Sequence, residues 1–451
     1  MRLNYDYKNR YLVEFNGRYD GSSKFPSGDR YKFFPSGALG WRISQEPFWM
    51  NTKALEWWTD FKIRVSYGSL GNQNVVDDFS YLPKYNVTES DNIFGSTLPK
   101  AIIAPPLVSG SITWETVNQL NLGIDASFLN HRLSLGVDIY NRKTKDMLWN
   151  GQPLPAVLGA AVPKENGADL ETKGFELTLG WTDQLKNGLS YWANFTLGDS
   201  KTTITKVNNP TKILSQFYSG QRYGEIWGLR SNGLFESKED VKNSPKQTLI
   251  GDNWGPGDVK YEDLDGDGKI TYGNLTYDEH GDYTVIGNNS PRFNFGISMG
   301  LEYKGFDLSM LWQGIMKRDY FISDYSFWGL DNILNEQTPI NSPHTFTLDY
   351  WTPENTGAYY PRPRWDSRAN RFPSDRYLQD ASYIRLKTLD LGYTLPKQWI
   401  STLHIQKARL FVSMENLLTF SDLPKAFDPE SVTTESYPTP RKVSLGFNLT
   451  F

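Results

Sequence analysis

Residues Lys442–Phe451 read KVSLGFNLTF, and this segment predicts the fold of the chain. Apolar residues occupy every second position, with small or polar residues between them. Such a period of two is typical of a β-strand with one apolar and one polar face. A transmembrane β-barrel ends in this way, because its last strand pairs with the first to close the wall. An edge strand of a soluble β-sandwich is the alternative. The apolar positions, which we predict to form the assembly signal of a barrel, are Val443, Leu445, Phe447, Leu449 and Phe451.

The same alternation recurs along the chain and predicts roughly thirteen antiparallel strands. Three segments are read as hairpins, turning at Asn130-His131, within DQLKNG and at Lys304-Gly305. The expected strands lie at Arg2–Tyr7, Tyr11–Tyr19, Tyr31–Ile43, Phe61–Tyr67, Leu120–Phe128, Leu133–Ile139, Phe175–Trp181, Leu189–Leu197, Phe293–Leu301, Phe306–Trp312, Tyr383–Leu395, Ala408–Phe420 and Lys442–Phe451.

The connections between these strands alternate in length. Short turns at Lys8-Asn9, Asn130-His131 and Lys304-Gly305 contrast with the long segments Lys206–Ser290 and Lys317–Gln379. Outer-membrane barrels have short periplasmic turns and long extracellular loops, whereas a soluble sandwich has no reason to place its long loops at one end. The sequence therefore predicts an all-β chain that forms a transmembrane antiparallel β-barrel with long extracellular loops. One connector, within Glu46–Glu56, has helical character.

Composition restricts the function. The chain has 451 residues with 47 Lys+Arg against 51 Asp+Glu, so it lacks the basic surplus of a nucleic-acid-binding protein. Aromatic residues make up 15%, as expected for the aromatic girdles of a barrel, although sugar-stacking surfaces are also aromatic. The absence of cysteine excludes thiol catalysis and thiolate zinc sites. No GxSxG, HExxH or Walker motif occurs, so we do not expect an enzyme.

The amino-terminal residues MRLNYDYKNRYLVEF enter the β pattern directly, without a signal peptide. We therefore expect residues 1–451 to be the carboxy-terminal part of a longer barrel. Bacterial barrels usually have an even number of strands, so an odd count is what a truncated barrel would show. Standing alone, such a partial set leaves two open edges. The polar positions of the strands should face the lumen, and among them are Arg64, Asn121, Asp125, Asp138, Glu176, Asn194, Asn294, Arg385 and Glu415.

An acidic segment in the longest connection resembles a calcium-binding loop. Alternating carboxylates supply the hard oxygen ligands that calcium prefers, and a glycine permits the sharp turn. Asn274 replaces the bidentate glutamate of the twelfth position, and three nearby acids, Asp278, Glu279 and Asp282, are candidates to substitute for it. The alternative is a solvated acidic turn. The predicted ligands of a weakly bound, structural Ca²⁺ are Asp263, Asp265, Asp267, Lys269 through its carbonyl, and Thr271.

The same connection contains five aromatic residues, and their rings have two interpretations. They stack on the rings of a sugar ligand, or they form a small core that holds the connection together. The predicted ligand-binding residues are Tyr218, Tyr223, Trp227, Phe235 and Trp254.

The chain resembles the carboxy-terminal part of the SusC/RagA family of TonB-dependent outer-membrane transporters. The matches occur in order along the whole chain, which makes the resemblance specific. They are VEFNGRYDGSSKF (Val13–Phe25), FFPSGALGWRISQEPFW (Phe33–Trp49), FKIRVSYGSLGNQ (Phe61–Gln73), ETKGFELTLGW (Glu171–Trp181), GEIWGL (Gly224–Leu229), GDVKYEDLDGDGKI (Gly257–Ile270), IGNNSPRFNFG (Ile286–Gly296), DASYIRLKTLDLGYTLP (Asp380–Pro396), VSMENLLTFS (Val412–Ser421) and YPTPRKVSLGFNLTF (Tyr437–Phe451).

This resemblance implies an active importer of oligosaccharides or peptides in the outer membrane of a Gram-negative cell. Family members have an amino-terminal plug domain with a TonB-box and a barrel of 22 strands, so residues 1–451 would lack the plug and roughly the first nine strands. The implied partners are a SusD-like surface lipoprotein, TonB–ExbB–ExbD through the plug, the barrel assembly machinery and outer-membrane lipid. Two alternatives stay open, namely a passive or non-functional barrel fragment and a soluble carbohydrate-binding β protein.

Overall fold

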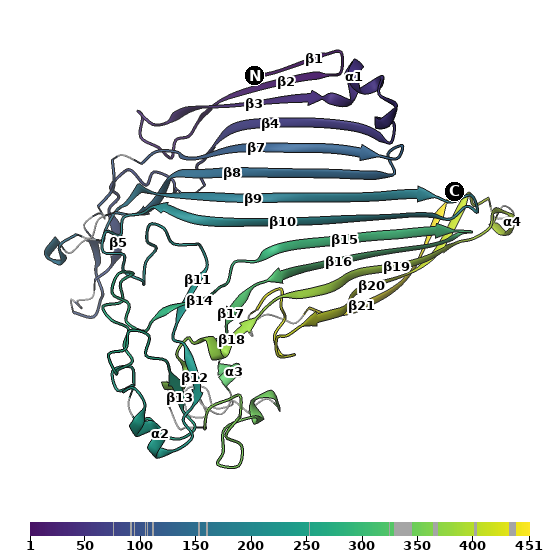
Figure 1. Ribbon diagram of the computed structural model, residues 1–451. Coiled ribbons are helices and arrows are strands. Elements are labelled where there is room, and N and C mark those ends of the chain that lie inside the picture. Colours follow the sequence, from purple (N-terminus) through teal and green to yellow (C-terminus); the bar gives the residue numbers. More distant parts are fainter. Residues whose placement is uncertain are drawn as a thin grey trace.

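The computed structural model describes residues 1–451 apart from 75, 91, 92, 94, 104, 106, 111, 152, 153, 159, 160, 252, 324, 329–344, 364–368, 401–403 and 433–438. Within the described residues, thirteen strands form one large antiparallel sheet, which curves from β1 to β21 (Figure 1). Each strand of the sheet pairs with the strands of the sheet that precede and follow it along the chain. The order is β1-β2-β3-β4-β7-β8-β9-β10-β15-β16-β19-β20-β21. The predicted all-β chain of roughly thirteen antiparallel strands is confirmed.

The strands of the sheet are β1 (Arg2–Tyr7), β2 (Tyr11–Gly21), β3 (Tyr31–Arg42), β4 (Trp58–Asn72), β7 (Glu115–Phe128), β8 (Leu133–Asn150), β9 (Lys164–Gln184), β10 (Ser190–Lys206), β15 (Arg292–Tyr303), β16 (Phe306–Lys317), β19 (Tyr383–Thr394), β20 (Lys407–Ser421) and β21 (Lys442–Thr450).

The sheet has one apolar and one polar face, because the period-two pattern of each strand is in register with that of its neighbours. Leu122 lies opposite Ile139, and Ile124 lies opposite Val137. Side chains on the apolar face are open to the surroundings; Leu122, for example, is 50% exposed. The sheet is thus a single layer, and within the described part of the chain most of its apolar face is uncovered. A soluble sandwich, in which two sheets bury their apolar faces against each other, does not describe it.

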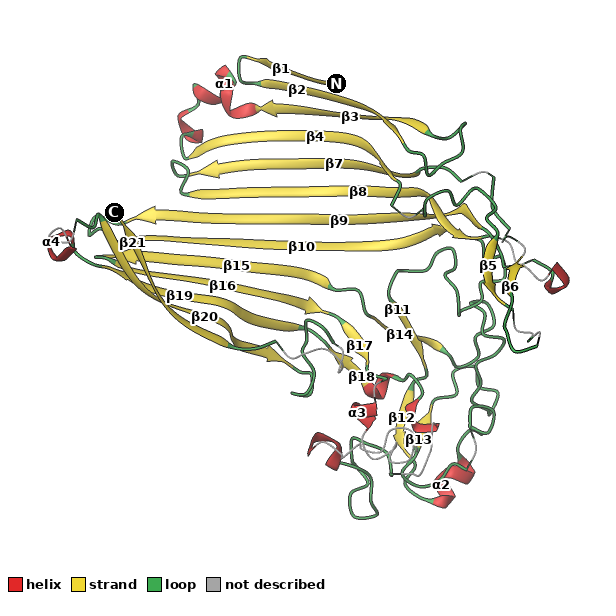
Figure 2. Ribbon diagram, turned by 180° about the vertical axis from the view of Figure 1, so that it is seen from behind, coloured by secondary structure: helices red, strands yellow, loops and turns green. Residues whose placement is uncertain are grey.

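The short connections lie at one end of the sheet and the long ones at the other, as Figure 2 shows from behind. Lys304 and Gly305 form the tightest turn, and both have positive φ angles, 48° and 88°, as a two-residue hairpin requires. The turn predicted at Asn130-His131 is longer than expected, because β7 ends at Phe128 and β8 begins at Leu133. The helical connector between β3 and β4 is confirmed as α1 (Pro47–Met50).

The long connections contain small elements that the sequence pattern did not reveal. Among the described residues no helix has the length and apolar character needed to cross a bilayer. The paired strands are β5 (Asn86–Glu89) with β6 (Lys100–Ile103), β11 (Glu225–Gly228) with β14 (Thr284–Asn288), β12 (Ser231–Leu234) with β13 (Val259–Tyr261), and β17 (Asp319–Phe321) with β18 (Leu378–Asp380); the helices of the long connections are α2 (Lys238–Asn243) and α3 (Tyr325–Trp328). A further helix, α4 (Lys397–Ile400), lies in the connection between β19 and β20, at the short-turn end.

Three long connections pack together around a common hydrophobic core. We call the described residues of 207–291, 318–382 and 422–441 the loop lobe. All three connections contribute fully buried side chains, so each is ordered by contacts with the other two. The core contains Leu229, Val259, Tyr261, Ile270, Ile322, Phe327, Trp328, Tyr377, Phe427 and Val432.

The two outermost strands of the sheet each have one unpaired edge. Within the described residues, β1 pairs only with β2, and β21 pairs only with β20. The two open edges expected for a partial barrel are therefore present, and the sheet is not closed into a cylinder.

Candidate functional site

Most of the aromatic residues proposed to bind a ligand lie inside the loop lobe. Phe235 and Tyr218 are 1% and 2% exposed, which leaves them almost no surface for a ligand in this conformation. Trp254 is partly buried against the core, and its indole Nε1–H donates to the carbonyls of Gln247 and Gly251 at 3.0 and 2.9 Å. These three side chains therefore lie in the interior of the loop lobe, which is the position that the small-core interpretation expects.

Trp227 lies among four other rings, at the outer side of the lobe core. Its ring centroid is within 6.4 Å of those of Tyr218, Tyr277, His280 and Tyr283. The Tyr218 hydroxyl donates to Glu225 at 2.7 Å. Burial, together with this carboxylate, raises the pKa of Tyr218 far above its ordinary value, so the hydroxyl stays protonated and remains a donor. The five rings therefore form a packed aromatic cluster in which Tyr218 is held by its hydrogen bond to Glu225.

Tyr223 is the exposed member of the predicted set, with 53% of its surface accessible. Its backbone is held on both sides, because its N–H donates to the Thr202 carbonyl and its own carbonyl accepts from Asn288 and Ser290. Two rings that the sequence reading missed continue the surface: Phe217 lies 6.0 Å from Tyr223 and 5.3 Å from Trp149 at the end of β8. We call these three rings the exposed aromatic strip, in which Tyr223 is exposed and the other two rings are half-buried.

The acidic segment forms the compact turn that its sequence predicts. Carboxylate oxygens of Asp263, Asp265 and Asp267 lie within 4.8 Å of one another. Asp263 accepts N–H groups from Gly266 and Gly268 at 2.7 and 2.8 Å. Burial raises the pKa of Asp263, but these hydrogen bonds outweigh it and hold the pKa below its usual value. The turn thus gathers three carboxylates, and its backbone N–H groups favour the charged form of Asp263.

The candidates for the twelfth calcium ligand have other roles in the described structure. Asp282 is fully buried and accepts N–H groups from Leu264 and Thr271 at 2.6 and 2.8 Å, so it stabilises the backbone of the turn. Asp278 pairs with Lys212, and Glu279 accepts from Asn274. The Lys269 N–H donates to Asp267. Calcium binding by this turn stays a prediction, and the absence of a bidentate carboxylate favours weak binding.

The polar face of the sheet contains an ion network that joins three strands. Arg64 on β4 donates to Asp125 on β7, at 3.1 Å from Nε, and to Asp138 on β8, at 2.7 Å from Nη1. Lys62 adds a second cation, 2.8 Å from Asp125. The guanidinium lies above Gly123, where a Cβ atom would come within 2.5 Å of Arg64 Cζ. The predicted polar-face residues are therefore brought together here, and Gly123 leaves the space that they need.

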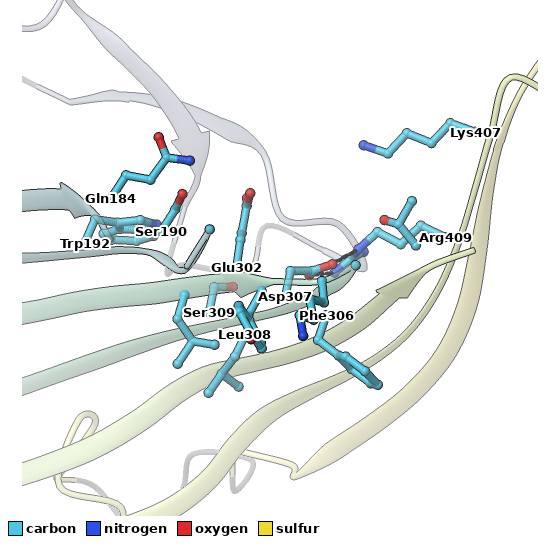
Figure 3. Close-up of a pocket in the computed structure, with 16 residues that line it drawn as sticks. Gln184, Ser190, Trp192, Glu302, Phe306, Asp307, Leu308, Ser309, Lys407 and Arg409 are labelled. Atoms are coloured by element: carbon cyan, nitrogen blue, oxygen red, sulfur yellow. Dashed lines mark hydrogen bonds and ion pairs between the residues drawn. The ribbon is translucent and has the colours of Figure 1, made fainter. Parts of the chain in front are cut away.

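A polar pocket of about 560 Å³ lies on the same face near the short-turn end (Figure 3). In its wall, Arg409 on β20 donates from Nε to Asp307 on β16 at 2.9 Å. The pocket shows that this end of the polar face is concave and charged. Other residues that line it are Gln184, Ser190, Trp192, Glu302, Ser309 and Lys407.

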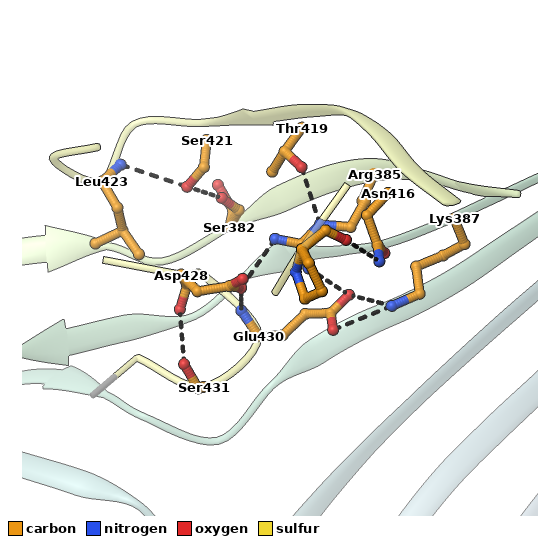
Figure 4. Close-up of polar contacts among 11 residues, drawn as sticks. Ser382, Arg385, Lys387, Asn416, Thr419, Ser421, Leu423, Asp428, Glu430 and Ser431 are labelled. Atoms are coloured by element: carbon orange, nitrogen blue, oxygen red, sulfur yellow. Dashed lines mark hydrogen bonds and ion pairs between the residues drawn. The ribbon is translucent and has the colours of Figure 1, made fainter. Parts of the chain in front are cut away.

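At the opposite end of the polar face, the last long connection is fastened to the sheet by ion pairs (Figure 4). Arg385 on β19 donates to Asp428 at 2.9 Å and lies 3.1 Å from Glu430. Lys387 donates to both carboxylate oxygens of Glu430, at 2.9 and 3.2 Å. The sequence identified Arg385 as a polar-face residue, but no pattern identified its acidic partners.

The predicted assembly strand is β21. Its side chains continue the apolar face, since Leu445 and Phe447 lie opposite Val412 and Leu410 of β20. Leu445 is 82% and Phe451 is 76% exposed. Val443 and Leu449 are exposed on the same face. The role of this strand in assembly remains a prediction.

The chain matches known proteins over its whole length. A family model described as "TonB dependent receptor-like, beta-barrel" matches residues 1–299. TonB-dependent receptor P3 of Formosa agariphila is 30% identical over 481 residues, which cover 100% of this chain and 45% of that protein. TonB-dependent receptor SusC of Bacteroides thetaiotaomicron is 27% identical over 467 residues, 100% of this chain and 43% of that protein.

Among solved structures, the RagAB peptide importer in its "closed-closed" state has a similar fold. The TM-score is 0.79 at 23% identity, and the match covers 100% of this chain and 47% of that chain. This chain therefore spans about half the length of the relatives that it matches. The matched family model covers most of the chain, and the relatives are receptors of one type. The chain belongs to the TonB-dependent receptor β-barrel family of the outer membrane and is similar to SusC and to the RagAB importer.

Proposed function

We propose that this chain forms part of the wall and mouth of an active importer that takes up oligosaccharides or peptides across the outer membrane. One observation carries the proposal: three long connections build an ordered loop lobe at a single end of the sheet, and ion pairs from Arg385 fasten that lobe to the polar face. A lobe with its own core, placed where a channel opens, is suited to holding a ligand at the entrance.

The names of the relatives support the same proposal. SusC is a TonB-dependent receptor, and the RagAB structure is that of a peptide importer. By this analogy, the partner on the loop side is a SusD-like surface lipoprotein, and TonB–ExbB–ExbD supplies energy through a plug domain. The exposed aromatic strip offers ring faces that suit sugars and aromatic or proline side chains equally, so it supports both substrate classes.

Deletion and uptake experiments test this proposal. The gene that encodes the full-length protein is deleted, and growth is measured on a panel of single oligosaccharides and peptides. We expect growth to be lost on one class of nutrient and restored by the intact gene. Uptake of the labelled nutrient should stop when a protonophore removes the energy source. Uptake that continues under the protonophore would identify a passive pore, and unchanged growth on every nutrient would refute the importer.

Affinity purification of the full-length protein from detergent-solubilised outer membranes tests the partner separately. We expect a surface lipoprotein of SusD type to co-purify in equal amount. The Arg385→Ala variant, which we expect to loosen the loop lobe, should retain less of it. Purification of the receptor by itself, with an intact lobe, would count against the partnership.

A further inference from the structure

The connector between β3 and β4 (residues 43–57) differs from the other connections at the short-turn end, because it folds back over the apolar face. Trp49 stacks on Phe61 of β4, with ring centroids 5.6 Å apart and planes at 29°. Trp57 stacks on Phe128 of β7 at 5.4 Å. Phe61 lies opposite Ala126, one of the apolar positions of β7, so these rings are on the side of the sheet that carries the apolar side chains.

The connector is held in this position at both ends. At its start, Glu46 Oε1 accepts hydrogen bonds from the Tyr11 hydroxyl at 2.7 Å and the Trp41 Nε1–H at 3.0 Å. Arg10 lies 3.6 Å from the other oxygen of the same carboxylate. At its end, the Trp57 carbonyl accepts the Leu129 N–H at 2.7 Å. The segment is therefore a fixed projection from the wall and not a freely moving loop.

Three large apolar side chains of this fixed segment are exposed. Phe48, Met50 and Trp57 are 58%, 57% and 54% accessible, respectively. Exposed lysines, Lys8 in the β1–β2 turn and Lys53 in the connector, lie at the same end of the sheet. Apolar and aromatic side chains next to basic residues are typical of segments that lie in the interface between lipid headgroups and acyl chains.

We propose that the β3–β4 connector is an interfacial anchor, in which Phe48, Met50 and Trp57 insert into the phospholipid leaflet around the short-turn end. Lipid is the expected partner of these three side chains, because the rings of the connector continue the apolar face that the wall of an outer-membrane barrel presents to lipid. Interfacial segments of this kind lie roughly 5–10 Å deep, at the boundary between headgroups and acyl chains. The short-turn end faces the periplasm in outer-membrane barrels, so the leaflet is the inner one.

A single-cysteine label tests the anchor in the full-length protein. Residues 1–451 contain no cysteine, so Met50→Cys introduces a unique site once cysteines elsewhere in the full chain are replaced by serine. The label is a polarity-sensitive fluorophore, and the protein is reconstituted into phosphatidylethanolamine–phosphatidylglycerol vesicles. Lys186→Cys is the matched control, because Lys186 is exposed in the β9–β10 turn at the same end of the sheet.

We expect the label at position 50 to emit at shorter wavelength than the label at position 186. We also expect it to lose intensity when the acyl chains carry bromine near the headgroup. A second label, introduced by Phe48→Cys, should behave like that at position 50. Equal emission and equal quenching at positions 50 and 186 would overturn the proposal. A label at position 50 that is shielded from water but not quenched by brominated lipid would also overturn it, because a protein would then cover the connector.

Discussion

The guanidinium of Arg385 and the carboxylate of Asp428 lie 2.9 Å apart, although 43 residues separate them in the sequence. Arg385 belongs to the wall and Asp428 to the last long connection, so their contact joins the rigid sheet to the loop lobe. Both side chains are shielded, with only 4% and 13% of their surfaces exposed. A buried ion pair therefore connects the loop lobe directly to the sheet.

Arg385→Ala should release the connection that contains Asp428. Removing one partner of a buried pair leaves an uncompensated charge and typically costs about 3–5 kcal/mol. Hydrogen exchange of residues 422–432 should accelerate, while the strands of the sheet keep their protection. Arg2→Ala is the control, because its pair with Glu14 is exposed and solvent screens the attraction between the two charges. Unchanged exchange in residues 422–432 would show that the pair does not hold the lobe.

Acidification should release the same connection. Burial raises the pKa of Asp428, but hydrogen bonds from the Glu430 N–H, Thr439 and Arg385 outweigh it and hold the pKa below its ordinary value. A carboxyl with a lowered folded-state pKa contributes stability above its unfolded value, about 3.9, and loses it as the pH falls through the folded value.

Protection of residues 422–432, corrected for intrinsic amide exchange, should therefore be constant from neutral pH down to about pH 4 and then decrease. In Asp428→Asn this decrease should be absent, with low protection at every pH. A loss of protection that already begins near neutral pH would assign the effect to another group.

Charge on the apolar face of β21 should destabilise the barrel, whereas charge on the other face should not. Leu445→Arg places a guanidinium among exposed apolar side chains, and Arg near the bilayer midplane costs about 2–4 kcal/mol. Ser444→Arg is the matched control, one residue away and on the polar face. Unfolding in urea, followed by heat-modifiable mobility, measures the difference. Equal stabilities would contradict the assignment of the lipid-facing side. We also expect Phe451→Glu to reduce assembly into outer membranes.

Two substitutions separate the ligand-binding and core interpretations of the aromatic residues. Tyr223→Ala removes an exposed ring and should weaken nutrient binding without changing the stability of the loop lobe. Phe235→Ala empties a core position, and a Phe→Ala cavity costs about 3–5 kcal/mol, so the lobe should lose exchange protection. Unaltered nutrient affinity in Tyr223→Ala would remove the exposed aromatic strip from the binding surface.

Calcium should bind to the acidic turn weakly, with a Kd of about 10⁻⁴–10⁻³ M, because the bidentate ligand is missing. Titration calorimetry of the full-length protein should lose this heat in the double variant Asp265→Asn, Asp267→Asn. Asp77→Asn, an acidic residue outside the turn, is the control. The same heat in the double variant would exclude the turn as the site.

The sheet could be predicted from the sequence because the alternation of apolar and polar residues is visible within each strand by itself. Each strand has a period of two, and in-register pairing such as Leu122 with Ile139 follows once one face is apolar. The loop lobe obeys no such rule. The Val259 N–H donates to Asn370, 111 residues away, and neither position stands out in its local sequence. Core rings and ligand-stacking rings are also the same residue types, so the sequence does not distinguish Phe235, which is buried, from Tyr223, which is exposed.

The shared core of the loop lobe has a consequence for how such receptors diversify. Surface loops usually accumulate insertions independently, because each contacts little besides water. Here Phe427 packs against Phe327, and Phe327 packs against Trp328. A change of side-chain volume at Phe427 would therefore alter the packing of residues that belong to a different connection. We therefore expect single changes in one connection to destabilise the lobe unless the other two connections change with it. New nutrient preferences are expected to arise by recombination that replaces the lobe as one block, while the sheet beneath it is inherited with little alteration.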